Sequence, residues 1–522
     1  MHKFIIALTL SFSSITTSQA QTPTWAEDIA PILYNNCTKC HHDGGIAPFP
    51  LMEYSEATAN SHGISHATGT GEMPPWPADP SYRHYSGERL LKPSEIAAIK
   101  SWADNGTPQG DLKKAPTKPI YSKDSKIGKY DLKIKIPTYT SSASTDDIYR
   151  CFSLPSNLTS TKFIEAIEIV PGNSKIVHHV LVFQDTTNVT NNLDKADPLP
   201  GYTNFGGTGS NNSILIAPYV PGSDPIKFPS GTGVKLYKKA NIILQIHYPA
   251  GTAGEVDSSY VVIRFHTQPS IREVYIAPIL NHYNILNGPF SLAKDQVKTF
   301  YQGLTLPYDV SLLSILPHMH LIGKSTKVFA IPPTKDTIPL IRIKNWDFHW
   351  QGEYKFQFVQ RLTKGTKIQS IVTYDNTQNN PNQPSNPAKI VTLGEATTSE
   401  MMLTYFYYMD YQAGDENILQ DSSLIKAGIY SKFSSNKILI YPNPANHEIF
   451  IEGIPNFKEA KLLVIDQLGR TVLEKTVTNY TEDAQFLHRT WIRLEGLSNG
   501  VYSIQMITED GKVYHNKFIK QE

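Results

Sequence analysis

The sequence predicts a multidomain fold, with a small helical domain first and β-sandwich domains after about residue 130. A chain of 522 residues is long enough for about three or four domains. Helical patterns at 25–36 and 94–102 predict helices near the front. After residue 130, short runs rich in β-branched and aromatic residues recur between Pro and Gly turn signals, which is typical of β-sandwiches.

The N-terminal residues predict export. Residues 1–20 combine Lys3, a short apolar stretch at 4–10 and a small-residue end at Ala20, which is typical of a signal peptide cleaved before Gln21. An uncleaved anchor is the alternative, but the apolar stretch is shorter than the roughly eighteen residues that a membrane span needs. We therefore expect a mature chain without a transmembrane anchor.

The charge and the cysteine content argue against a nucleic-acid-binding protein and against a disulfide-rich protein. A net charge of +1 with 18% charged residues gives no basic field, so nucleic acid is not an expected partner. The chain has three cysteines, and two of them belong to one short motif, so we expect no internal disulfide framework.

That motif is Cys37-x-x-Cys40-His41, near the front of the chain. In this spacing two thiols form thioethers to a haem and the following histidine becomes an iron ligand, and attachment takes place outside the cytoplasm. A redox disulfide or half of a zinc site is the alternative. The motif therefore predicts one covalent c-type haem.

The surrounding residues resemble a small cytochrome c domain, which we place at 21–112. A helix leads into the motif, and a capped helix at 94–102 closes the domain. Met73, in a proline-rich loop, is the best candidate for the second iron ligand, and His62, His66 and His84 are weaker rivals. A linker rich in Pro, Lys and Ser follows at 113–129.

Two histidine clusters lie in strand-like apolar runs further on. His318-x-His320 places both imidazoles on one face of a strand, whereas the adjacent pair His178-His179 reaches a single ion only if the backbone twists or bulges. His247 and Met401 could complete two metal sites. Imidazole with thioether favours copper over zinc, although each residue taken alone is more typical of a packed core.

The order of these motifs from about 130 to 415 resembles the copper type II, ascorbate-dependent monooxygenases, the family of peptidylglycine alpha-hydroxylating monooxygenase and dopamine beta-hydroxylase. The resemblance implies two jelly-roll-type β-sandwiches of about eight or nine strands each, at 130–267 and 268–420, with a solvent-filled cleft between them. Further shared motifs are Tyr149-Arg150-Cys151-Phe152, Gln245-Ile246-His247-Tyr248, Gly323 and Glu400-Met401.

The resemblance also assigns the ligands. The electron-transfer copper would be held by three histidines: His178, His179 and His247. The copper that binds dioxygen beside the substrate would be held by His318, His320 and Met401, with Tyr405 on the substrate side. Six ligands complete both sites, so His349 is interpreted as packing or as support for a ligand.

Departures from the family pattern bear on the substrate. Leu316 stands where the peptide-processing enzyme has an arginine, and Leu403 and Tyr407 replace an asparagine and a methionine. We therefore expect a pocket for a small apolar or aromatic substrate. Cys151 lacks its family disulfide partner, because Asp185 occupies that position.

These observations predict hydroxylation of a substrate C–H bond with dioxygen. Electrons would come from an external donor, through the fused haem or from an ascorbate-like reductant. The alternative is a surface electron-transfer or binding protein that has copper sites and no hydroxylase activity. Structural zinc is the third possibility, and Met401 argues against it.

The tail has its own pattern. After a linker at 421–436, residues 437–522 contain Tyr441-Pro442-Asn443-Pro444, alternating strands and Gly500-Val501-Tyr502. This resembles the C-terminal sorting domain of the type IX secretion system, a small β-sandwich that directs cargo across the outer membrane after periplasmic transit. An accessory β-domain with a binding role is the alternative. We expect a secreted or cell-surface protein with the type IX machinery as a partner.

Overall fold

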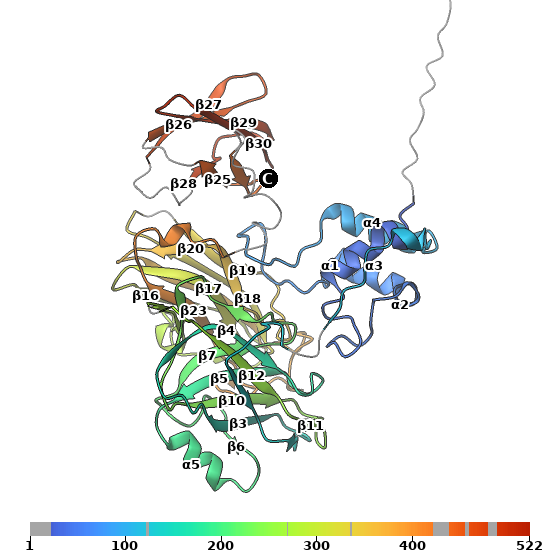
Figure 1. Ribbon diagram of the computed structural model, residues 1–522, viewed down its shortest axis with the longest axis vertical. Coiled ribbons are helices and arrows are strands. Elements are labelled where there is room, and N and C mark those ends of the chain that lie inside the picture. The colour runs from blue at the N-terminus through green and yellow to red at the C-terminus, as the bar shows by residue number, and fades with distance from the viewer. Residues whose placement is uncertain are drawn as a thin grey trace, which may run out of the picture. The chain divides into compact units, whose positions relative to one another are not determined.

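The computed structural model describes residues 22–121, 125–268, 270–334, 337–420, 438–454, 459–478 and 488–521. The predicted signal peptide and the linker at 421–436 lie outside the described residues. The chain divides into two compact units, one made of Met1–Pro74 and Leu90–Tyr121 and the other of Pro75–Arg89 and Ser122–Glu522 (Figure 1).

The first unit is helical. A π-helix, η1 (Trp25–Ile29), runs into α1 (Ala30–Asn36), and the Thr24 side chain caps it by accepting from Glu27 N. These helices and α4 (Pro93–Asp104) confirm the helical patterns of the sequence. The Trp25 and Trp102 rings lie 6.3 Å apart in the core, which brings η1 and α4 together. Further helices are α2 (Tyr54–Ala59) and α3 (Ser61–Thr70).

The first β-sandwich contains two sheets. One has the order β1 (Leu132–Lys135), β12 (Tyr260–Phe265), β4 (Lys162–Val170), β9 (Thr232–Leu236), β13 (Arg272–Glu273), with β8 (Ile226–Lys227) beside β4. The other has the order β6 (Tyr202–Thr203), β3 (Ile148–Pro155), β10 (Asn241–Tyr248), β5 (His179–Asp185), β7 (Ile214–Tyr219). The six strands of one sheet and the five of the other together outnumber the eight or nine that the resemblance implied for the sandwich. The difference comes from two-residue strands that extend the sheets.

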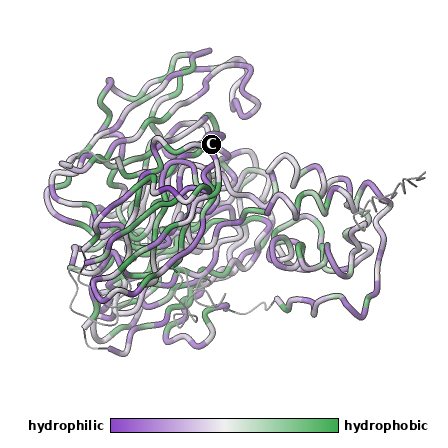
Figure 2. Tube along the Cα trace, turned by 90° about the horizontal axis from the view of Figure 1, so that it is seen from above, coloured by the Kyte–Doolittle hydropathy of each residue, from purple (hydrophilic) through white to green (hydrophobic). Residues whose placement is uncertain are grey.

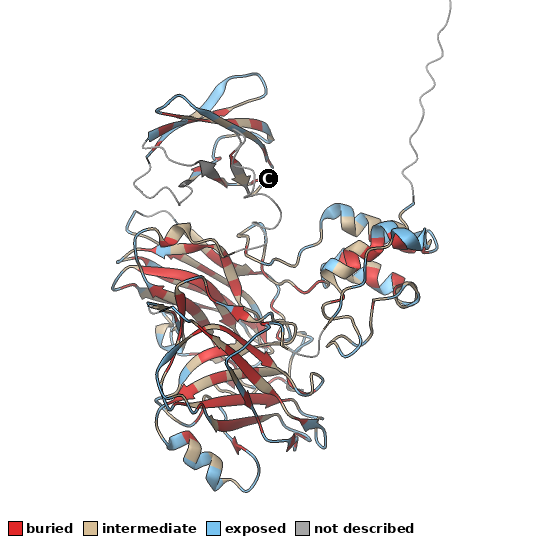
Figure 3. Cartoon of the chain, viewed as in Figure 1, coloured by how far each residue is buried: buried red, intermediate tan, exposed pale blue. Residues whose placement is uncertain are grey.

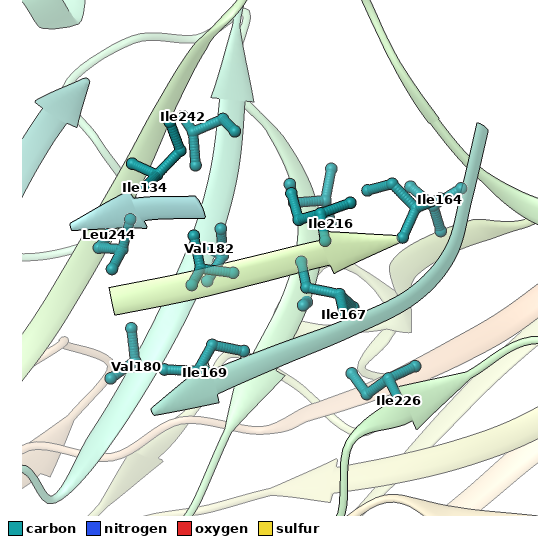
Figure 4. Close-up of a cluster of buried hydrophobic side chains, with 14 of the residues drawn as sticks. Ile134, Ile164, Ile167, Ile169, Val180, Val182, Ile216, Ile226, Ile242 and Leu244 are labelled. Atoms are coloured by element: carbon teal, nitrogen blue, oxygen red, sulfur yellow. The ribbon is translucent and has the colours of Figure 1, made fainter. Parts of the chain in front are cut away.

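Aliphatic side chains from both sheets form the core of this sandwich. Figure 4 shows isoleucine, valine and leucine side chains gathered between the strands. The central strand β10 is buried from its second residue to its last, as expected for a strand with neighbours on both sides. Hydrophobic and hydrophilic residues are interspersed along the chain (Figure 2), and buried residues concentrate in the sheets while α5 (Val189–Ala196) is largely exposed (Figure 3).

The second β-sandwich has two four-stranded sheets. The first has the order β14 (Tyr275–Leu280), β23 (Leu403–Asp410), β17 (Val310–His318), β20 (Tyr354–Leu362). The second has the order β16 (Val297–Thr305), β21 (Lys367–Asp375), β18 (Gly323–Ile331), β19 (Ile338–Ile343). Ile276, Leu313 and Tyr407 belong to the same buried cluster as the core of the first sandwich, so the two sandwiches share apolar packing.

The segment Pro75–Arg89 differs from expectation, because it belongs to the β-rich unit although the sequence placed it inside the domain at 21–112. Ala78 forms a β-bridge with Ile343, and the buried Tyr85 hydroxyl donates to Leu340 O at 2.6 Å. Asp79 pairs with Arg342 at 2.7 Å. Long-range pairing of this kind leaves no local signal in the sequence. The helical unit in turn extends to Tyr121, into the predicted linker at 113–129.

The C-terminal residues form a separate β-sandwich with its own apolar core. Its sheets have the orders β24 (Leu439–Tyr441), β25 (Glu448–Ile454), β28 (His488–Arg493) and β27 (Thr471–Thr478), β26 (Glu459–Ile465), β29 (Gly500–Thr508), β30 (Val513–Lys520). Among the helices that the structure describes, none has both the length and the apolar character needed to pass through a membrane.

Candidate metal centre

Three histidines of the first sandwich converge. His179 opens β5 and lies directly opposite His247 on β10. His178 precedes the regular strand and donates its backbone N–H to His247 O at 3.0 Å. Because His178 stands outside the regular strand, the alternation of side chains does not separate it from His179. The backbone irregularity that the sequence required is therefore present.

The nitrogen atoms of these rings fit a metal ion. His179 Nδ1 lies 3.2 Å from His178 Nδ1 and 3.3 Å from His247 Nδ1, and all three ligand atoms lie within 4.8 Å of one another. Three nitrogens bound at about 2.0 Å to one tetrahedral ion would lie roughly 3.3 Å apart. The two distances from His179 Nδ1 match this value.

Burial keeps the imidazoles of His178 and His179 neutral. Burial, with a smaller contribution from His247, lowers the pKa of His178 to about 3, and burial also holds the pKa of His179 well below its usual range. His247 Nε2 faces the Asp147 carboxylate, with Oδ2 at 3.2 Å. The Tyr149 ring stacks on His247 with the centroids 4.4 Å apart.

The second histidine set lies at the end of β17. His318 Nδ1 donates to Gln351 Oε1 at 2.6 Å, and His320 Nδ1 donates to Ser399 O at 3.1 Å. Each ring therefore carries its lone pair on Nε2, the tautomer suited to a metal ligand. Met319 is buried in the core of the second sandwich, as expected for the residue between the two histidines.

Glu400 ties this set to Met401. Its buried carboxylate accepts from the backbone N–H groups of His320 at 2.8 Å, Ile322 at 2.9 Å and Met401 at 3.2 Å. Burial raises the pKa of Glu400 to about 8, although these hydrogen bonds oppose the shift. Sequence reasoning used Glu400 only as part of a motif. Its role in holding the loop became visible with the structure.

Both sets line one cavity of about 230 Å³. His178, His179, His318, His320 and Met401 all contribute to its wall. The lining is otherwise largely apolar and aromatic, and it contains the residues named as substrate-side or as departures from the family: Leu316, Leu403, Tyr405 and Tyr407. Burial raises the pKa of Tyr405 to about 12, so its hydroxyl is protonated at neutral pH.

One carboxylate faces this cavity. Glu395 is the acidic member of the lining, which contains no lysine or arginine, and burial raises its pKa. Glu395 stands outside the histidine motifs, so no pattern in the sequence predicted that it lines the cavity. His349 also lines the cavity, where it pairs with Asp347 at 3.2 Å, and its ring lies 6.3 Å from that of His178.

In the helical unit, Cys37 caps α1 and is followed by Cys40 and His41. Both thiols are free, and His41 Nδ1 donates to Phe49 O at 2.9 Å, which leaves Nε2 available to an iron ion. The c-type haem itself stays a prediction from the sequence motif. Met73 N donates to Ala67 O at 3.0 Å in the same unit.

The other candidates for the second iron ligand are divided between the two units. His62 and His66 lie on α3, whereas His84 lies in the segment 75–89 and pairs with Glu88 at 2.9 Å. The third cysteine, Cys151, is buried on β3 and free, and the Asp185 carboxylate accepts from Thr187 N at 2.8 Å.

Comparison with known proteins supports two regions. Residues 439–521 match the family model described as the secretion system C-terminal sorting domain, which confirms the predicted domain at 437–522 and the prediction of an exported protein, secreted or at the cell surface. A tyramine beta-hydroxylase of Caenorhabditis briggsae is 22% identical over 270 residues, a match that covers 49% of this chain and 43% of that protein. DBH-like monooxygenase protein 1 of Mus musculus is 22% identical over 277 residues, with the same coverage.

This chain therefore spans less than half the length of these curated relatives. Among solved structures, PNGF-II is similar at a TM-score of 0.23 and 9% identity, over 54% of this chain and 65% of that one. That likeness is too low to bear on fold or function.

Proposed function

We propose that this chain is an exported copper-dependent monooxygenase that hydroxylates a C–H bond of a small substrate with dioxygen. The observation that carries the proposal is the pair of histidine sets on one cavity, one with three neighbouring ring nitrogens and the other with two histidines and Met401 in the same lining. The names of the two relatives, a hydroxylase and a monooxygenase, support it.

The chain's own residues have distinct roles in this proposal. His178, His179 and His247 would hold one copper ion, and His318, His320 and Met401 the other. Bound copper supplies a metal that cycles between Cu(I) and Cu(II) and activates dioxygen, which imidazole and thioether ligands favour. Gln351 and Ser399 fix the tautomers of the second set, and the apolar wall of the cavity excludes water from the reacting groups.

The cavity also suggests the class of substrate. Leu316, Leu403 and Tyr405 offer apolar and aromatic contact, and Glu395 supplies a single negative charge with no fixed cation in the lining. A small substrate with an apolar or aromatic body and a positively charged group would satisfy both. The name of the tyramine hydroxylase relative agrees with this class.

The helical unit would supply electrons. Cys37 and Cys40 would attach a haem, His41 would bind its iron, and Met73 is the candidate second ligand. Covalent linkage to the β-rich unit keeps such a haem at a high effective concentration near the copper sites. An ascorbate-like reductant would then serve as an external donor.

Metal content tests the proposal. We expect the mature, haem-loaded protein to contain two copper ions and one iron ion per chain by elemental mass spectrometry. His179→Ala and His320→Ala should each lose one copper and abolish reductant-dependent oxygen consumption with a small aromatic amine. Copper-loaded protein that takes up no oxygen with reductant and substrate would favour an electron-transfer protein, and a chain that binds zinc instead of copper would overturn both readings.

A further inference from the structure

The loop at 346–351, between β19 and β20, is fastened to the second histidine set on both sides of Phe348. On one side, Trp346 Nε1 donates to His320 O at 3.2 Å. On the other, Gln351 Oε1 accepts from His318 Nδ1 at 2.6 Å, while Gln351 Nε2 donates to Phe348 O at 2.9 Å. The position of Phe348 is therefore fixed relative to the second set.

The Phe348 ring touches one histidine of each set. It stacks on His178, with the centroids 5.2 Å apart and the planes at 17°, and it meets His320 edge to face at 6.1 Å and 86°. Only 8% of Phe348 is exposed. A single phenyl group of the second sandwich thus bridges a ring of the first sandwich and a ring of the second.

This position has two physical effects. Parallel stacking restrains the orientation of the His178 ring, whose Nδ1 belongs to the first set. The phenyl group also fills space between the sets that water would otherwise occupy, and it places a chain of van der Waals contacts there. Electrons that move between the sets therefore have a direct contact through carbon atoms.

We propose that Phe348 is a positioning residue that holds the two histidine sets at a fixed separation and provides the contact through which an electron passes from the first to the second. This inference rests on the proposed function, because it requires copper at both sets. Copper held by the first set would give up one electron, going from Cu(I) to Cu(II), and copper held by the second set would take it up, going from Cu(II) to Cu(I). The external reductant then restores the first, and the phenyl group exchanges no proton.

The test uses full-length, copper-loaded protein and two substitutions of this residue. Phe348→Leu keeps apolar bulk and removes the ring, and Phe348→Tyr keeps the ring. Oxidised protein is mixed anaerobically with excess ascorbate and frozen at intervals, and the Cu(II) signals of the two sites are followed separately by electron paramagnetic resonance.

In the unsubstituted protein and in Phe348→Tyr, the two signals should disappear together. In Phe348→Leu, the signal of the three-nitrogen site should disappear at the normal rate and that of the second site should lag by about tenfold or more, because small misplacements of reacting partners have effects of this order. Both substituted proteins should retain two copper ions per chain.

Phe228→Leu is the matched control, because Phe228 is buried to a similar degree, at 9% exposed, and lies outside the cavity lining. It should reproduce the unsubstituted rates. Simultaneous loss of both signals in Phe348→Leu would overturn the inference while leaving the proposed function intact. Loss of copper from the first set in that variant would also overturn it, since Phe348 would then only support His178. An unsubstituted chain that binds fewer than two copper ions would overturn the inference together with the proposed function.

Discussion

The Gln351 side chain accepts a hydrogen bond from His318 Nδ1 at 2.6 Å, and this contact sets the tautomer of a predicted copper ligand. Gln351→Leu should lower copper affinity at the second set by about tenfold to a hundredfold, because partners of this kind orient the ligands that bind the metal. Copper titration monitored by electron paramagnetic resonance checks this. Gln360→Leu, whose amide donates to Phe358 O away from the cavity, should leave both affinities unchanged. Equal loss in the two variants would argue against the assignment.

Glu400 should matter for stability as well as for the site. Above pH 8, where the Glu400 carboxyl is ionised and both oxygens accept, Glu400→Gln replaces an acceptor oxygen by an N–H donor that faces backbone N–H groups, so we expect a loss of about 1–3 kcal/mol in the free energy of unfolding. Denaturant unfolding of the copper-free protein measures it. Glu165→Gln, in a partly exposed pair with Arg264 at 2.8 Å, should cost less than about 1 kcal/mol. Equal losses of unfolding free energy in the two variants would show that the Glu400 carboxyl does not hold the loop.

The charge of Glu395 should determine which substrates bind. Glu395→Gln should raise the KM for a small aromatic amine by about tenfold to a hundredfold, because a hydrogen bond between charged groups is lost. The KM for a neutral analogue of the same size should stay within about threefold. Steady-state oxygen consumption distinguishes these cases, and parallel changes for both substrates would exclude a specific role for the charge.

Protonation of Asp79 at acid pH should release the segment 75–89 from the second sandwich. Burial would raise the pKa of this carboxyl, but the Lys344 ion pair, hydrogen bonds from Ser81 and the Arg342 charge outweigh it and lower the pKa to about 2. Since the folded-state pKa is below the ordinary 3.8, the stabilisation is complete above pH 3.8 and is lost as the pH falls through about 2.

Hydrogen exchange at the Ser86 amide, which donates to Lys355 O at 2.8 Å, follows this release. Exchange should accelerate between pH 4 and pH 2 beyond the intrinsic chemical change, by an amount that corresponds to about 1–2 kcal/mol. In Asp79→Asn it should already be fast at pH 5, with little further dependence on pH. Identical profiles for the two proteins would show that Asp79 does not secure the segment.

His41→Ala tests the haem prediction without touching the copper ligands. In cells that attach c-type haem, the unsubstituted protein should carry one covalent haem by its pyridine haemochrome spectrum. The variant should lose the axial iron ligand and its normal absorption, while it retains two copper ions per chain. His62→Ala, on α3, should keep both the haem and its spectrum. Absence of covalent haem from the unsubstituted protein would refute the assignment.

Local patterns in the sequence predicted the features that depend on neighbouring residues. The helices around Cys37-x-x-Cys40-His41 and the direction of Met319, away from the two histidines and into the core, follow from spacing alone. The convergence of His178 with His179 required an irregular backbone, and spacing could state that requirement without showing how it is met. The structure meets it by starting β5 at His179.

Features that depend on distant residues had no such signal. Gln351 and Ser399 reach the second histidine set from other parts of the chain, and no motif marks them. The bridge from Ala78 to Ile343 likewise joins residues far apart in sequence, so contiguity alone assigned the segment 75–89 to the wrong unit. The strand count of the first sandwich was low because two-residue strands carry no periodicity.

The interruption of the helical unit by the segment Pro75–Arg89 has a consequence for inheritance and for biosynthesis. The helical unit is not one contiguous block of sequence that evolution could add or remove. Removal of the whole stretch would also remove Tyr85 and Asp79, which bond Leu340 and Arg342 of the second sandwich. During synthesis, Tyr85 emerges 255 residues before Leu340, the partner that its hydroxyl bonds. The Tyr85 side chain is therefore without its native partner while about half of the chain is made, and that interval is where a chaperone would be needed.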